Sequence, residues 1–196
     1  MPTEIELKAR VTDPDKLRII LSNLAVFDRT FEKSDVYYTM SSQDPAQTSE
    51  YGVRIRKEAS IHASGLSRDT TFITQKSREI RGDIEINDEN EFEVSSGSAF
   101  LRFLLHLGFR EKNRKKKNGH AFLYEGMTVE LTNVDGLGWF IEAEIIIPGN
   151  DEAKINESRE RLKSFLEKIG IPETSLETRS YSSMLANNSG TQQQSV

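Results

Sequence analysis

The segment Glu4-Ile5-Glu6-Leu7-Lys8-Ala9-Arg10-Val11 alternates charged and apolar side chains without interruption. Such a repeat predicts a β-strand, because successive residues of a strand point to opposite faces. One face would be apolar, and the other would carry the four charged residues, Glu4, Glu6, Lys8 and Arg10. Taken alone, the pattern is also typical of a half-buried strand whose polar face meets solvent.

Pairs of like charges separated by one residue recur along the chain and favour a different interpretation. They are Arg54 and Arg56, Glu91 and Glu93, Lys115 and Lys117, and Glu142 and Glu144, and Lys76 ends a further segment of this kind. Like charges on one face of a strand repel, so several such strands facing plain solvent would lose stability without any gain. Turned toward one another, the same side chains would be able to hold metal ions and phosphates.

Length and composition limit the class of protein. The 196 residues suffice for one domain with a sizeable core, and a content of 36% hydrophobic and 29% charged residues is typical of a soluble globular chain. There is no long apolar run and no signal peptide, so we expect a cytoplasmic protein with no membrane partner. The absence of cysteine excludes disulfides and thiolate metal sites. A net charge of −5 argues against nucleic acid as a partner.

Local patterns predict eight strands and three helices. The helices, recognised from apolar spacing, capping residues and terminal glycines, are expected at 13–24, from Ser96 or Ser98 to His106, and from an Asn150 cap to Gly170. The strands are expected at 4–11, 29–40, 51–57, 69–76, 89–94, 110–117, 121–131 and 139–147. The intervening segments are interpreted as a loop at 41–50, a long hairpin connection at 58–67, an arch over the sheet edge at 77–88 and a turn at Asn118-Gly119. Residues 176–185 are expected to pack as a short segment.

This order of elements has no βαβ rhythm and predicts the α+β class, with an antiparallel sheet that curls or closes. A closed eight-stranded barrel has an interior that holds side chains or one small ligand. Because helices on the outside must cover the apolar face of the sheet, the charged face is expected to point into the barrel.

Glu4-Ile5-Glu6-Leu7-Lys8 matches the ExExK signature of the CYTH superfamily, also called triphosphate tunnel metalloenzymes. The chain resembles this family over residues 3–185 through further motifs, which are Asp35-Val36-Tyr37-Tyr38, Arg54-Ile55-Arg56, Thr74 to Lys76, Glu91-Phe92-Glu93 and Val134 to Glu144. The length and the terminal Arg179 to Leu185 look most like the bacterial branch of class IV adenylyl cyclases and thiamine triphosphatases. The resemblance implies a tunnel domain at 1–185, and the polar tail at 186–196 is expected to be disordered.

A triphosphate site needs fixed cations, and arginine adds bidentate hydrogen bonds. The expected triphosphate-binding residues are Lys8, Arg54, Arg56, Lys76, Lys115 and Lys117. The expected metal ligands are Glu4, Glu6, Glu142 and Glu144, and Glu91 and Glu93 are expected to bind metal, orient a basic side chain or position water. Glu4, Glu6, Lys8, Glu142 and Glu144 are the expected catalytic residues. Oxygen ligands of this kind suit Mg²⁺ or Mn²⁺.

Two positions depart from the family pattern. Alignment of the motifs puts Gly119 where the family has an arginine and Thr132 where it has a metal-binding aspartate, with Lys115 and Asp135 as candidate substitutes. Three functions stay open as a result: a metal-dependent hydrolase of inorganic tripolyphosphate, thiamine triphosphate or a nucleoside triphosphate, a class IV adenylyl cyclase, and a non-catalytic polyphosphate or nucleotide binder. The expected partner is a small-molecule triphosphate, and the protein is expected to be a monomer or a homodimer.

Overall fold

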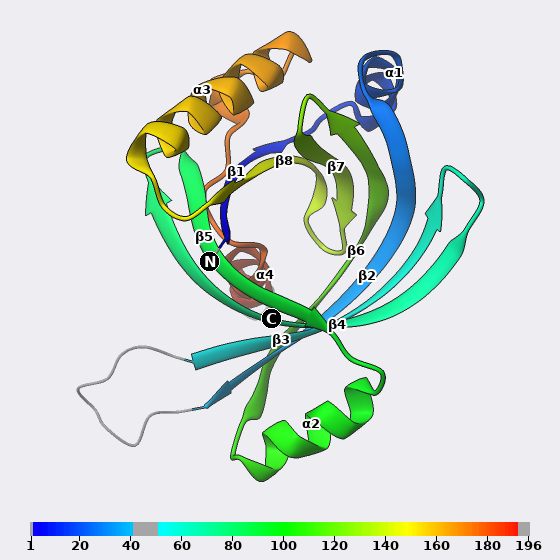
Figure 1. The fold of residues 1–196 in the computed structure, drawn as a ribbon, viewed down its shortest axis with the longest axis vertical. Coiled ribbons are helices and arrows are strands. Elements are labelled where there is room, and N and C mark those ends of the chain that lie inside the picture. Colours follow the sequence, from blue (N-terminus) through cyan, green and yellow to red (C-terminus); the bar gives the residue numbers. More distant parts are fainter. Residues whose placement is uncertain (1, 41–50, 192–196) are drawn as a thin grey trace.

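The strands of the protein close into an antiparallel barrel, as the computed structural model in Figure 1 shows for residues 2–40 and 51–191. The order around the barrel is β1-β5-β4-β3-β2-β6-β7-β8, and β8 pairs with β1 to close it. The eight strands are β1 (Pro2–Arg10), β2 (Val26–Met40), β3 (Tyr51–His62), β4 (Ser67–Arg81), β5 (Ile84–Glu93), β6 (Arg110–Tyr124), β7 (Met127–Val134) and β8 (Gly138–Pro148). The predicted α+β class and closed eight-stranded barrel are confirmed. The loop predicted at 41–50 lies outside the described residues.

The helices in the described part of the chain are α1 (Pro14–Leu24), α2 (Gly97–His106), α3 (Glu152–Lys168) and α4 (Tyr181–Thr191), with a short 3₁₀ turn, η1, at Glu173–Ser175. The helices α1, α2 and α3 pack on the outside of the barrel, as predicted. Helix α4 lies instead at one end of the barrel, where its residues pack on Val134 and Phe140. None of the described helices combines the length and apolar character that a membrane span requires.

The main core lies between the barrel wall and helices α1 and α3. The apolar residues of β1, which are Ile5, Leu7 and Ala9, are completely buried there. A side chain of this size contributes about 1.5–3 kcal/mol when fully buried. Because every second residue of β1 is committed to this core, Glu4, Glu6 and Lys8 must line the interior of the barrel.

Strands β3, β4 and β5 are longer than their sequences predicted. Strand β3 continues to His62 and β4 begins at Ser67, so the long connection predicted at 58–67 is wrong and only a tight turn joins the strands. Strand β4 continues to Arg81 and β5 begins at Ile84, so the predicted arch at 77–88 is also wrong. The charged residues in these segments resemble a loop in sequence. In the structure they are paired strand residues. Charged side chains are tolerated there because each strand has a face that lines the tunnel or meets solvent.

The turn predicted at Asn118-Gly119 is wrong. Both residues lie inside β6, opposite Asn133 and Thr132 of β7, and the chain reverses at Glu125-Gly126, where both residues have positive φ. Glycine at position 119 allows the backbones of β6 and β7 to lie close together, because a Cβ placed there would lie 2.1 Å from the carbonyl oxygen of Leu131.

The C-terminal region is more regular than its composition indicates. The cap of α3 is Asp151, not the predicted Asn150, and its carboxylate accepts hydrogen bonds from the N–H groups of Ala153 and Lys154. Helix α4 continues to Thr191, past the predicted start of the tail, and residues 192–196 lie outside the described part. Before α4, the chain pairs with β1 through a bridge between Ala9 and Leu176.

Candidate active site

A cavity of about 820 Å³ runs inside the barrel and is lined by charged side chains from all eight strands. Eleven of the twelve residues predicted for the site line it, which are Glu4, Glu6, Lys8, Arg54, Arg56, Lys76, Glu91, Lys115, Lys117, Glu142 and Glu144. The exception is Glu93, which is half exposed and accepts a hydrogen bond from Arg68 at 2.5 Å. The alternation of charges therefore identified the inner face of nearly every strand.

Three carboxylates converge on one wall of the cavity. Glu4 and Glu6 follow one another on the inner face of β1, and Glu144 of β8 lies opposite Glu6. One oxygen from each of the three lies within 4.8 Å of the others. Burial and the charge of Glu4 raise the pKa of Glu144 to about 8, and burial and the charge of Glu142 raise the pKa of Glu6 well above its usual range. A bound cation would relieve this repulsion.

Glu142 lies on the same strand but has a different partner. The ammonium of Lys117 donates to Glu142 at 2.7 Å and also to Glu130 of β7 at 3.2 Å. Burial alone would raise the pKa of Glu142, but the adjacent Lys117 outweighs it and the pKa falls to about 2. Glu142, predicted as a metal ligand, is therefore held by a cation and is not part of the carboxylate trio.

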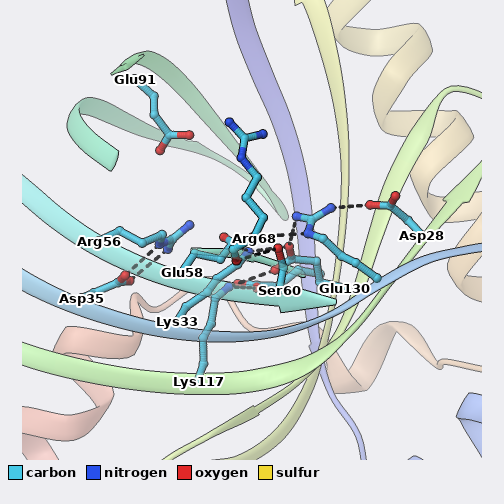
Figure 2. A network of polar contacts seen from close by, with 12 residues as sticks. Asp28, Lys33, Asp35, Arg56, Glu58, Ser60, Arg68, Glu91, Lys117 and Glu130 are labelled. Carbon is cyan, nitrogen blue, oxygen red and sulfur yellow. Dashed lines mark hydrogen bonds and ion pairs between the residues drawn. The ribbon is translucent and has the colours of Figure 1, made fainter. Parts of the chain in front are cut away.

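Arg56 and Lys115 share one counter-ion, Asp35, as Figure 2 shows for the arginine. Asp35 lies opposite both residues in the strand register. Its burial acts to raise the pKa of its carboxyl, yet the charge and hydrogen bonds of Arg56 hold that pKa well below the usual range. The sequence motif contained Asp35, but no role was predicted for it.

The cations of β3 and β4, Arg54 and Lys76, are also paired with carboxylates. Lys76 of β4 donates to Glu4 at 2.9 Å and lies 3.4 Å from Glu89. Arg54 donates to Glu89 and to Glu91, each at 3.1 Å. Of the three roles that the sequence left open for Glu91, orientation of a basic side chain is the one that this geometry favours.

Several cavity residues were not predicted. Two pairs among them join Lys33 to Glu130 at 2.5 Å and Arg29 to Glu58 at 3.3 Å, and Figure 2 shows the network around them. Other cavity residues that were not predicted include Glu85, Glu89 and Tyr181. A signal was present for Glu58 and Glu130, because each lies an even number of residues from a predicted inner-face position, Arg56 and Thr132.

The structure gives a reason for one of the two departures from the family motifs. Gly119 has no space for a side chain, as the contact with Leu131 shows. The side chain of Thr132 is completely buried, and its hydroxyl has no hydrogen-bond partner among the described residues. Of the two candidate substitutes, Lys115 lines the cavity, whereas Asp135 is exposed in the turn after β7.

Comparison with known families gives a clear result. A family model described as the CYTH domain matches residues 2–181, from the start of β1 to the first residue of α4. This chain belongs to the CYTH domain family. The resemblance inferred from the motifs is confirmed, and most of the charged residues that carried it line the tunnel of this CYTH protein.

Relatives of this CYTH protein extend over nearly its whole length. A Methanocaldococcus jannaschii protein named "Putative adenylate cyclase" is 24% identical over 180 residues, which cover 91% of this chain and 95% of the relative. A solved structure of a Pyrococcus horikoshii protein is 26% identical with a TM-score of 0.77, covering 94% of this chain and 98% of that one. A "putative adenylyl cyclase" from Hippeastrum, described as having a dominant triphosphatase activity, is 16% identical with a TM-score of 0.58 over 97% of this chain and 96% of its own. This last likeness shows the fold alone.

Proposed function

We propose that this CYTH protein hydrolyses a triphosphate inside its tunnel with the help of a divalent cation. The observation that carries the proposal is the convergence of acidic and basic side chains inside one cavity. The carboxylates Glu4, Glu6 and Glu144 lie together on one wall, where Lys76 reaches Glu4 at 2.9 Å, and the six predicted phosphate-binding cations line the cavity from four strands. A triphosphate with one bound divalent cation has the complementary distribution of charge.

The carboxylate trio fits Mg²⁺ or Mn²⁺. Its oxygens are close enough to share one ion, and its side chains are held by the barrel wall, not by a mobile loop. Hard divalent cations prefer such oxygen ligands. The pKa values of Glu144 and Glu6 are raised by burial and by neighbouring carboxylates, which supports a further positive charge at the trio. A bound ion would supply charge neutralisation for phosphate oxygens and would lower the pKa of a water molecule.

The protein's own residues supply the remaining requirements of phosphoryl transfer, which are mainly positioning and stabilisation of negative charge. Arg54 and Arg56 offer planar guanidinium groups for phosphate oxygens, and Lys8, Lys76, Lys115 and Lys117 offer ammonium groups. The oxygen of an attacking water would bond to the terminal phosphorus while the bond to the bridging oxygen breaks. The products are phosphate and the shortened diphosphate, with a proton released to the medium.

Two other functions have specific support. Adenylyl cyclase activity is supported by the name of the Methanocaldococcus jannaschii relative, and it would use the same cations with the ribose 3′-hydroxyl as the attacking group. Binding of polyphosphate or nucleotide without turnover is supported by Gly119 and Thr132, which replace a basic and an acidic residue of the family pattern. We also propose a cytoplasmic location, a small-molecule triphosphate as partner and a monomeric or homodimeric state.

One assay separates the three functions. Purified protein is incubated with Mg²⁺ or Mn²⁺ and with tripolyphosphate, thiamine triphosphate or ATP, and phosphate, pyrophosphate and cyclic AMP are measured. We expect metal-dependent phosphate release that Glu144→Gln abolishes and that Glu93→Gln, outside the cavity, leaves intact. Cyclic AMP with equal pyrophosphate would identify a cyclase, and tight binding without turnover would identify a binder.

A further inference from the structure

Tyr181, the first residue of α4, is held in the tunnel by the chain that precedes it. Backbone pairing fixes this chain against β1, since the N–H of Glu177 donates to the carbonyl of Lys8 at 2.8 Å. The guanidinium of Arg10 reaches both Glu177 and the sulfur of Met184, on either side of Tyr181. The position of Tyr181 is therefore set by the same strand that carries the carboxylates Glu4 and Glu6.

The ring of Tyr181 organises two cations of the site. It packs edge to face on Phe140 at a centroid distance of 4.9 Å, and the side chain is 5% exposed. The ammonium groups of Lys8 and Lys115 lie 4.7 and 4.9 Å from the ring centroid. Two cations at one aromatic ring are attracted by its π face, which lessens the cost of placing them close together.

The hydroxyl of Tyr181 is the unexplained feature. It is buried, the residue lines the cavity, and no acceptor among the described residues meets it at the distance and angle of a regular hydrogen bond, although the carboxylate of Glu142 interacts with it. Buried tyrosine hydroxyls normally find a partner, because leaving one unsatisfied costs stability. Burial and the charge of Glu142 raise the pKa of Tyr181 well above its usual value, so the hydroxyl keeps its proton at neutral pH and can act as a donor. Because the ammonium groups of Lys8 and Lys115 lie at the ring of the same residue, the acceptor that this position favours is an anionic oxygen.

We propose that the hydroxyl of Tyr181 donates a hydrogen bond to a phosphate oxygen of the bound triphosphate. Helix α4 thus contributes a direct substrate contact, and the ring of Tyr181 positions Lys8 and Lys115 for the same phosphate group. This inference rests on the proposed function. It gives a role to the segment Arg179 to Leu185, which the triphosphate mechanism otherwise leaves without one.

The test compares Tyr181→Phe with Tyr124→Phe. Tyr124 is a matched control, because its hydroxyl accepts from Lys168 on the outside of the barrel. Binding of tripolyphosphate in the presence of Mg²⁺ is measured by calorimetry, together with phosphate release and the melting temperature. We expect Tyr181→Phe to weaken binding about tenfold or more without lowering the melting temperature of the free protein, because it removes only an unpaired donor. Tyr124→Phe should bind as the wild type does.

The outcomes separate this inference from the proposed function. If the wild type binds and hydrolyses tripolyphosphate and Tyr181→Phe does so equally well, the hydroxyl contacts no phosphate and the inference is wrong while the function stands. If the wild type neither binds nor hydrolyses any triphosphate, both fail. Tyr181→Leu should lose more affinity than Tyr181→Phe, because it also releases Lys8 and Lys115, and equal losses in the two variants would contradict the role of the ring.

Discussion

The guanidinium of Arg56 donates two hydrogen bonds to the carboxylate of Asp35, at 2.7 and 2.9 Å, and the side chain of Asp35 has no exposed surface. Lys115 lies 3.3 Å from the same carboxylate. One buried anion therefore fixes two of the cations proposed to bind phosphate. The site is oriented before any substrate enters, which is the arrangement that electrostatic stabilisation of a phosphoryl group requires.

Asp35→Asn should destabilise the free protein by about 3–5 kcal/mol, because it leaves two buried cations without their counter-ion. Tripolyphosphate should restore part of this loss by binding the folded state. Urea denaturation at neutral pH, with and without tripolyphosphate, measures both effects. Asp135→Asn, in an exposed turn, is the control and should change little. Equal stabilities of the two variants would show that Asp35 does not balance these cations.

The carboxylate trio should make the metal-free protein less stable as the pH rises. The pKa of Glu144 is raised from 4.5 to about 8 on folding, so its contribution is fully favourable below pH 4.5 and is lost as the pH approaches 8. Glu144→Gln should raise the melting temperature near pH 8 by about 5 °C or more, and should flatten the decline between these pH values. Melting curves in EDTA measure this effect. Glu93→Gln should keep the wild-type slope, and a wild-type slope for Glu144→Gln would contradict the raised pKa.

The stabilisation by the Lys117–Glu142 pair should depend on pH in the opposite direction, and Lys117→Met should remove it. The pKa of Glu142 is lowered to about 2 in the folded protein, so its pairing with Lys117 stabilises above pH 4.5 and is lost as the pH falls toward 2. Loss of the ammonium should raise the pKa of Glu142 and cost about 3–5 kcal/mol at neutral pH. Carboxyl NMR titration and urea denaturation report the two effects. Lys116→Met, on the exposed face of the same strand, is the control.

Gly119→Ala should destabilise the barrel by about 3 kcal/mol or more, because the added methyl group would force β6 and β7 apart. Gly52→Ala is the matched control, since it is also a strand glycine and a Cβ there meets nothing within 4 Å. Thermal and urea denaturation measure the stabilities of the two variants relative to the wild type. A stable Gly119→Ala protein would mean that the family's arginine could be restored at this position.

The amino-acid sequence by itself determined which face is charged in six of the eight strands. Alternation depends only on the local geometry of a strand, so the inner-face positions of Glu4, Glu6 and Lys8 could be inferred without knowing any neighbour. Closure of the sheet followed from the same pattern, since an apolar face under helices leaves the charged face to the interior. The ends of β3 and β4 were misjudged, because polar residues in a tunnel strand have the composition of a loop.

Only the tertiary structure decided which charges meet. Strand register places Glu144 opposite Glu6 and leaves Glu142 beside Lys117, so two residues of one motif have opposite pKa shifts. The return of the C-terminal segment to β1 brings Tyr181 to Lys8. Such pairings depend on the relative position of strands far apart in the chain, and local sequence contains no measure of that position. Electrostatic energies fall with distance, and therefore the chemistry of the tunnel is fixed by register and closure.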